Sequence, residues 1–490
     1  MHARSVHGLL ERSAADGPER TFIVHEDERA SYGEIDARAN RLARLLRERG
    51  VMPGDRVLML ATNSSFAAIA GYGVMKAGAV SVPLNAQAPV EAVERARADC
   101  GARVLLADLR CSRIAAKVAG VEAIIAPELD EQDAAPLELA VAEDDLAAII
   151  YTSGSTGAPR GVMLSHANIL ANTRSIVGYL GITEQDRVLA LLPFSYVYGM
   201  SVLNTHCAAG AAVVIENRFA FPNTALDTLE REACTTLPGV PSTFAILLNR
   251  STFAERELAS LRTITQAGGP MAPELTRRLR EACPHARLFL MYGATEASAR
   301  LAYLHPDALD ERMGSIGKAI PGVELRVLRA DDSEAADDEV GELVARGANI
   351  MRGYWGAAEE TDTVLGPEGY RTGDLARRDA DGYLWITGRA RDMIKAGAHR
   401  IAAREIEDAV MAFEGVHETA VIGVPDDLLG EAIRAYVVFR GEPEAAELER
   451  HLKRVLPAYK VPTQLEVLAE LPKNLSGKID KQALRAFAGV

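Results

Sequence analysis

A glycine- and hydroxyl-rich loop is the strongest chemical feature of the sequence. It covers residues 151–161, reads YTSGSTGAPRG, and combines three glycines, four Ser or Thr residues and Arg160. Glycines let the backbone approach a ligand closely, and N–H and O–H donors beside a cation suit a polyphosphate. The Gly-Lys-Ser/Thr ending of the common nucleoside-triphosphatase loop is absent. The segment therefore predicts a polyphosphate site, with an ordinary polar surface loop as the alternative.

The elements around this loop predict an α/β fold. An apolar run at residues 146–150 precedes the loop and indicates a buried strand. Residues 31–50 have helical periodicity, and strand and helix patterns then alternate up to about residue 110 and again over residues 186–291. This alternation is typical of a parallel sheet with helices on its faces.

The pattern changes after about residue 323, where short strand-like segments separated by Asp/Gly turns predict a β-rich subdomain. Beyond residue 388 it becomes mixed, with helices expected near 403–413 and 444–455 and strands between them. We place a domain boundary at 388–392. The prediction is a large N-terminal domain of parallel-sheet layers plus the β-rich subdomain, residues 1–388, and a small mobile α+β C-terminal domain, residues 389–490.

Composition excludes several classes of function. A chain of 490 residues is too long for one hydrophobic core. Its net charge of -14 disfavours a nucleic-acid partner. Five cysteines without a CxxC spacing argue against a disulfide framework or a zinc site. We find no signal peptide and no membrane span, so we expect a cytoplasmic protein.

Several separated motifs together resemble the adenylate-forming (AMP-binding) superfamily. That superfamily includes acyl-CoA synthetases, the adenylation domains of peptide synthetases, and luciferases. Besides the loop, the motifs are SYGEI (31–35), MKAGAVSVPL (75–84), LPFSYVYG (192–199), AGGP (267–270), MYGATE (291–296), YRTGDL (370–375), GRARD (388–392) and LPKNLSGKI (471–479). They occur in the family's order across nearly the whole chain.

The resemblance implies a site for ATP and Mg²⁺. In the family, backbone near Gly269 and the ring of Tyr292 flank adenine, while Thr295 contacts the α-phosphate. Glu296 would hold Mg²⁺, and a carboxylate beside a triphosphate suits that metal. The implied nucleotide-binding residues are Thr152, Ser153, Gly154, Ser155, Thr156, Gly157, Arg160, Gly268, Gly269, Pro270, Met291, Tyr292, Gly293 and Asp374, the last for the ribose hydroxyls.

The same resemblance implies a two-step reaction. The substrate carboxylate attacks the α-phosphorus of ATP, pyrophosphate leaves, and a thiol then attacks the acyl-adenylate. Lys478 would bridge the two anions in the first step, assisted by Thr295 and Arg389. Members of the family rotate the small domain between the steps, and Arg391 occupies the hinge position.

Four residues are implied for the acid pocket: Ser195, Tyr196, Ala299 and Arg300. Amino-acid-activating relatives usually carry aspartate where this chain has Ser195, which disfavours an α-amino acid. Arg300 has two interpretations, a contact to a second carboxylate of the substrate or an ion pair with a neighbouring acid. We favour the ion pair, because charged residues usually serve structure or solubility.

The acceptor thiol belongs to coenzyme A or to the phosphopantetheine of a separate acyl or peptidyl carrier protein. Many thioester-forming members have glycine where this chain has Ala398, and proline where it has Ala403. These two differences leave the choice of acceptor open. The competing functions are a stand-alone amino-acid-activating ligase, a luciferase-like oxygenase, and a non-catalytic nucleotide-binding protein.

Overall fold

The computed structural model describes residues 3–125, 133–153, 159–396, 399–426, 430–442, 444–473 and 479–489. Contacts between residues divide the chain into two units. The first contains residues 1–325 and 345–370, and the second contains residues 326–344 and 371–490. The predicted boundary at 388–392 falls elsewhere and stays a prediction about the domains.

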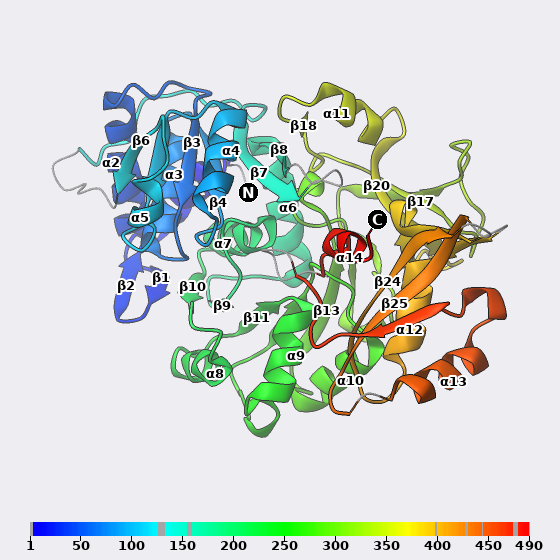
Figure 1. Ribbon diagram of the computed structural model, residues 1–490. Helices are drawn as coiled ribbons and strands as arrows, with labels where there is room; N and C mark the ends of the chain where they lie inside the picture. The colour runs from blue at the N-terminus through cyan, green and yellow to red at the C-terminus, as the bar shows by residue number, and fades with distance from the viewer. Residues whose placement is uncertain are drawn as a thin grey trace. The chain divides into compact units, whose positions relative to one another are not determined.

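A seven-stranded sheet in the first unit leads into the phosphate loop (Figure 1). Its order is β18-β8-β7-β4-β3-β5-β6; strands β4, β3, β5, β6 and β7 are parallel, and β8 runs antiparallel to β7. The strands are β3 (Arg56–Leu60), β4 (Val80–Leu84), β5 (Val104–Ala107), β6 (Glu122–Ile125), β7 (Leu146–Ser153), β8 (Pro159–Ser165) and β18 (Gly353–Tyr354).

A nine-stranded sheet completes the framework of the first unit. Its order is β15-β14-β13-β12-β11-β9-β10-β1-β2, with a parallel centre and antiparallel strands at both ends. The strands are β1 (Thr21–His25), β2 (Glu28–Ser31), β9 (Arg187–Ala190), β10 (Ala212–Ile215), β11 (Thr236–Gly239), β12 (Thr263–Gln266), β13 (Arg287–Tyr292), β14 (Ala302–Leu304) and β15 (Lys318–Ala319). The parallel-sheet prediction is confirmed for both central regions.

Helices cover the strands of both sheets, and α3 contacts strands of each. The helices of this unit are α1 (His7–Asp16), α2 (Tyr32–Glu48), α3 (Ser65–Lys76), α4 (Val90–Cys100), α5 (Ser112–Ala115), α6 (His166–Leu180), α7 (Val197–Ala209), α8 (Pro222–Arg231), α9 (Pro241–Arg250), α10 (Pro273–Ala282) and α11 (Ala358–Val364). Helix α2 begins where the sequence indicated, because Ser31 and Glu34 form a reciprocal capping box.

Long-range contacts tie the N-terminal segment to the middle of the chain. Strand β1 pairs in parallel with β10, so that Ile23 lies opposite Val213. The hydroxyl of Ser13 in α1 donates to the carbonyl of Cys207 in α7 at 2.7 Å, across 194 positions of sequence. The first helix and strand are therefore parts of the main core and not a separate appendage.

Two buried histidines, His7 and His166, contact each other in the first unit. The Val6 backbone N–H donates to Nδ1 of His166 at 3.0 Å, and the ring of His7 lies edge-on to His166. Burial, with Lys76 nearby, lowers the pKa of His7 to about 3, and burial beside His7 lowers the pKa of His166 to about 3. Both rings are thus neutral in the folded protein at ordinary pH.

A five-stranded sheet contains the β-rich segments that the sequence predicted. Its order is β16-β17-β20-β19, and β21 pairs with β20. The strands are β16 (Val323–Leu328), β17 (Gly341–Gly347), β19 (Leu365–Gly366), β20 (Gly369–Arg378) and β21 (Leu384–Arg389). The division between the two units falls within β16, β17 and β20.

The C-terminal part of the second unit is an α+β structure. Its sheet has the order β23-β22-β25-β24, and β26 pairs in parallel with β25. The elements are β22 (Met393–Ala396), β23 (His399–Ala402), α12 (Ala403–Met411), β24 (Val416–Asp426), β25 (Gly430–Phe439), α13 (Ala445–Val455), β26 (Gln464–Val467) and α14 (Lys481–Phe487). The α+β prediction is confirmed, and the movement of this part stays a prediction.

All five cysteines are free and buried. No helix in the described ranges combines the length and the hydropathy needed to cross a bilayer.

Candidate functional site

The predicted motifs emerge from one edge of the nine-stranded sheet. Strands β9, β11, β12 and β13 are parallel neighbours, so their carboxyl ends lie at the same edge. The segment 192–199 follows β9, the segment 267–270 follows β12, and Tyr292 ends β13. Ligands of open α/β sheets bind outside the carboxyl ends of the strands, and the sequence places its polar motifs there.

The predicted adenine segment is a tight turn between β12 and α10. Gly268 has φ +85°, a conformation that an L side chain rarely adopts, and the carbonyl of Gly269 accepts a hydrogen bond of 2.7 Å from the Gln266 amide. A Cβ atom at Gly293 would lie 1.8 Å from the Ala299 carbonyl oxygen. Glycine is thus required at 293, because two backbone segments meet there.

The phosphate loop is the connection of a β-hairpin and not a strand-to-helix turn. Strands β7 and β8 are antiparallel, and Thr152 lies opposite Arg160. The predicted residues Gly154, Ser155, Thr156 and Gly157 lie outside the described residues. The hairpin register still fixes both ends of the loop.

Tyr354 joins the end of the phosphate loop to the predicted metal ligand. Its hydroxyl donates to Oε1 of Glu296 at 2.9 Å, and the Arg160 guanidinium carbon lies 5.3 Å from the centre of its ring. Burial and the Glu296 carboxylate raise the pKa of Tyr354 well above its usual range. The phenol therefore stays protonated and remains a hydrogen-bond donor to Glu296.

The backbone of the 294–297 segment is also held in place. The Met351 N–H donates to the Glu296 carbonyl at 2.8 Å. Thr295 begins the single-turn 3₁₀ helix Thr295–Ala297, which contains Glu296. Strand β18 and its flanking residues thus position the 294–297 segment, although Glu296 and Tyr354 are 58 positions apart in the sequence.

The predicted acid-pocket residues Ser195 and Tyr196 lie immediately before helix α7. The Asn63 side chain accepts a hydrogen bond from the Phe194 N–H at 2.8 Å, and the Asn85 amide donates to the Tyr196 hydroxyl at 2.9 Å. Segments after β3 and β4 therefore fix the predicted substrate motif.

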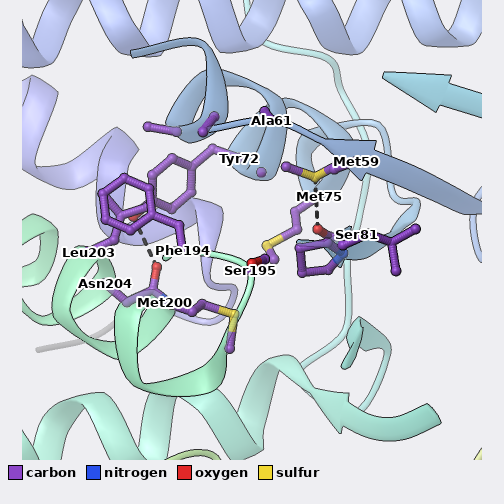
Figure 2. A pocket seen from close by; sticks show the side chains of 15 residues that line it. Met59, Ala61, Tyr72, Met75, Ser81, Phe194, Ser195, Met200, Leu203 and Asn204 are labelled. Atoms are coloured by element: carbon purple, nitrogen blue, oxygen red, sulfur yellow. Dashed lines mark hydrogen bonds between the residues drawn. The ribbon is translucent and has the colours of Figure 1, made fainter. Parts of the chain in front are cut away.

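A cavity of about 50 Å³ reaches Ser195. Figure 2 shows Ser195 and Phe194 on its wall together with three methionines, Met59, Met75 and Met200. Its wall also contains a polar pair, in which the Tyr72 hydroxyl donates to Oδ1 of Asn204 at 3.0 Å. Most of the other residues on its wall are apolar, among them Leu84 and Leu203.

Ala299 and Arg300 lie in a strained and firmly held segment. Ser298 has φ +55° and Ala299 has φ +117°, both unusual for residues other than glycine. The side-chain amides of Asn172 and Asn349 each donate to the Arg300 carbonyl at 2.9 Å. Strained backbone persists where surrounding contacts hold it, and it is common at binding sites.

The Arg300 side chain does not form the ion pair that the sequence favoured. It is 3% exposed, its Nε lies 3.3 Å from Sδ of Met291, and its guanidinium carbon lies 4.0 Å from the centre of the Tyr198 ring. Nη1 donates to the Ala299 carbonyl at 3.1 Å. Within the described ranges, no Asp or Glu forms a salt bridge with this guanidinium.

The predicted ribose and hinge residues lie in the second unit. Asp374 in β20 is opposite Arg389 in β21, and Nε of Arg389 lies 2.8 Å from the Asp374 carboxylate. The Asp374 side chain is 8% exposed, whereas that of Arg389 is half exposed. A planar guanidinium beside the carboxylate orients both groups.

Four predicted positions cannot be compared in full. Lys478 lies outside the described residues, and so does Ala398. The side chains of Ser153 and Arg391 are likewise outside the part of the chain that the structure describes. Their proposed roles stay predictions.

Sequence reasoning missed Tyr354, Tyr198 and Asn349. Tyr354 contacts two predicted site residues, Tyr198 stacks on Arg300, and Asn349 donates to the carbonyls of Ala297 and Arg300. Tyr198 was inside a recognised motif, so its position could have been noted. The GYWG run at residues 353–356 was an available signal for a turn, but its contact to Glu296 depends on tertiary structure.

Comparisons with known proteins agree with this arrangement. Residues 10–355 match the family model described as "AMP-binding enzyme", and residues 405–478 match its C-terminal domain. A feruloyl-CoA synthase from Amycolatopsis sp is 34% identical over 485 residues, which is 98% of each chain. Tyrocidine synthase 3 of Brevibacillus parabrevis is 31% identical over 492 residues, 98% of this chain but 8% of that protein.

A solved structure is equally similar. The o-succinylbenzoate coenzyme A synthetase of Bacillus subtilis, in complex with ATP and magnesium ion, has a TM-score of 0.88 and 30% identity, and the match covers 97% of this chain and 99% of that one. The chain belongs to the AMP-binding enzyme family. It is an AMP-forming acid–thiol ligase, which adenylates a carboxylic acid with ATP and then forms a thioester.

Proposed function

We propose that this chain activates a small carboxylic acid and transfers the acyl group to coenzyme A. The observation that carries the proposal is the contact of Tyr354 with both Arg160 and Glu296. It brings a cation from the phosphate hairpin and a carboxylate suited to a metal into one cluster. A triphosphate with its metal needs both kinds of group.

In the first step, a carboxylate oxygen of the acid bonds to the α-phosphorus of ATP, and the bond to the pyrophosphate oxygen breaks. Two anions approach each other, so positive charge and hydrogen-bond donors lower the barrier. Lys478 would bridge the carboxylate and the α-phosphate, with Thr295 donating to that phosphate. Arg160 and the 152–157 loop would hold the departing pyrophosphate, and Asp374 and Arg389 the ribose.

Glu296 suits Mg²⁺. Its carboxylate is oriented by the Tyr354 hydroxyl, and no group of three or more His, Cys, Asp or Glu side chains within the described ranges forms a complete metal site. Mg²⁺ typically binds one or two protein carboxylates and takes its remaining ligands from phosphates and water. When bound, the ion neutralises charge on the phosphates; the chain's own contribution is one fixed carboxylate.

In the second step, the thiol sulfur bonds to the acyl carbon, and the bond to AMP breaks. Coenzyme A is favoured as the acceptor because feruloyl-CoA synthase matches over 98% of both chains. The carrier-protein alternative rests on the match to Tyrocidine synthase 3. We expect the part of the chain after Arg391 to rotate between the two steps.

Acid-dependent exchange of labelled pyrophosphate into ATP tests this function directly. A panel of short aliphatic, aryl, dicarboxylic and amino acids should give exchange with one class. Lys478→Ala should reduce the exchange rate by more than about a hundredfold while leaving ATP binding within about threefold of wild type.

The matched control is Lys453→Ala, which removes an exposed lysine of helix α13. Unchanged exchange by Lys478→Ala would contradict the central assignment. Thioester formation with coenzyme A, but not with a phosphopantetheinylated carrier, would identify the acceptor.

A further inference from the structure

Arg300 carries a charge whose surroundings do not compensate it. Arginine is a cationic residue, and Arg300 is 3% exposed. Its contacts are a thioether, a backbone carbonyl and two neutral tyrosines, Tyr179 and Tyr198. Buried charges are normally paired with an opposite charge, because desolvation is costly.

The contacts that do exist are too weak to replace a counter-ion. The Tyr198 ring attracts the cation through its quadrupole, and the Met291 sulfur is a poor acceptor. The Tyr198 hydroxyl donates to the Thr265 carbonyl at 2.9 Å, and Tyr179 and Tyr198 both interact with Arg300 as neutral phenols. All of these neighbours are neutral, so none of them offsets the charge of the guanidinium.

The structure nevertheless holds this residue firmly. The strained φ of Ala299 comes directly before Arg300, and two buried amides fix the Arg300 carbonyl. A merely structural arginine needs no such arrangement, because an apolar side chain of similar volume is often as stable at a buried position. Strain that is maintained by several contacts indicates a functional position.

The position of the guanidinium connects it to the acid pocket. Tyr198, which stacks on it, comes three residues after Ser195 in the predicted substrate motif. Met291, which contacts Nε, comes directly before the predicted adenine residue Tyr292. Arg300 thus lies between the segments expected to bind the acid and the nucleotide.

We propose that Arg300 is the counter-ion for a second anionic group on the substrate. This inference rests on the proposed function and names its substrate class: a compact acid with a carboxylate or sulfonate in addition to the carboxylate that is adenylated. Both groups present oxygens that match the fork of a guanidinium in two parallel hydrogen bonds.

The test compares pairs of acids that differ in one anionic group: succinate with butyrate, phthalate with benzoate, and sulfoacetate with acetate. Pyrophosphate exchange gives kcat/KM for each acid, and the ratio within a pair measures selectivity for the second anion. The wild type should favour the anionic member. Arg300→Met should lower that ratio by about a hundredfold or more, and Arg300→Lys by less, since it keeps the charge but loses the fork.

The matched control is Arg277→Met, which removes an exposed arginine of helix α10 and should leave every ratio unchanged. Thermal unfolding supplies a second readout. Arg300→Met should keep or raise the melting temperature of the ligand-free protein, whereas loss of a structural ion pair would lower it. Succinate, phthalate or sulfoacetate should raise the melting temperature of the wild type and not that of Arg300→Met.

The outcomes separate the two proposals. Exchange that favours butyrate, benzoate and acetate would overturn the role of Arg300 and leave the proposed function standing. A loss of exchange with both members of each pair in Arg300→Met would also overturn it. Absence of exchange with every acid, together with an anion-dependent thermal shift that requires Arg300, would support the anion site and contradict the function. Absence of both would overturn both.

Discussion

Replacing Tyr354 with phenylalanine removes one hydroxyl and leaves the ring in place. In the folded protein that hydroxyl donates to Oε1 of Glu296 at 2.9 Å, while the ring packs beside Arg160. Hydrogen bonds to charged groups contribute about 1.5–3 kcal/mol, and this pair is only part-buried, so the lower end applies. A loss of about 1.5 kcal/mol corresponds to roughly a tenfold change in an equilibrium constant.

The Tyr354→Phe effect should appear in the Mg²⁺ dependence of pyrophosphate exchange. Without the phenol, the Glu296 carboxylate is no longer held in one orientation, so the Mg²⁺ concentration for half-maximal exchange should rise about tenfold. Since Arg160 keeps its aromatic neighbour, the KM for the acid should change little. Titrations of Mg²⁺ at saturating ATP and acid measure the first quantity, and acid titrations at saturating Mg²⁺ measure the second.

Tyr459→Phe is the matched control, because Tyr459 is 45% exposed and lies in the second unit. It should leave both quantities at the wild-type value. An unaltered Mg²⁺ dependence in Tyr354→Phe would refute the idea that this hydroxyl orients the metal ligand. A rise in acid KM alone would instead place Tyr354 at the acid pocket.

Two further predictions concern the framework of the site. Gly293→Ala should abolish exchange or prevent folding, because the new Cβ atom would lie 1.8 Å from the Ala299 carbonyl oxygen. The control is Gly178→Ala, whose Cβ atom would have open space around it. This control should keep exchange activity and should not lower stability in urea unfolding. His7 and His166 have a pKa of about 3 in the folded protein and 6.5 in the unfolded chain. Their contribution to the free energy of unfolding should therefore be complete above pH 6.5 and should be lost as the pH falls toward 3. At pH 5 each histidine should lower the free energy of unfolding by about 2 kcal/mol. The prediction would be contradicted by a His7→Gln, His166→Gln double variant whose stability depends on pH in the same way as that of the wild type.

Local patterns predicted most elements because local forces determine them. Residues 31–50 combine a capping box with an apolar stripe, and α2 forms within that range. The run at 146–150 forms part of β7. Short strands were harder to predict: β1 and β2 contain five and four residues, and the place of β1 beside β10 depends on contacts almost 200 positions away. Sheet order is a tertiary property that periodicity does not encode.

The candidate site shows the same limit. The family resemblance assigned roles to Glu296, Asp374 and the residues around Tyr292, and these roles stay predictions. Average residue behaviour assigned Arg300 to an ion pair for which the described residues provide no acid. The ion-pair expectation came from the average behaviour of arginine, whereas the strained backbone at Ala299 can be seen only in three dimensions. Tyr354 escaped notice because its partner Glu296 is 58 positions away.

The pairing of the first helix and strand with the middle of the chain has a consequence for synthesis on the ribosome. Ser13 contacts the Cys207 carbonyl across 194 positions, and β1 needs β10 as its neighbour. Translation adds about 5–20 residues per second, so roughly 10–40 s pass before these partners exist. During that time α1 and β1 expose apolar side chains such as Leu9, Leu10 and Phe22, all fully buried in the finished fold. The emerging chain is therefore a client for chaperones that bind early hydrophobic segments, and slower translation before residue 210 should increase its aggregation.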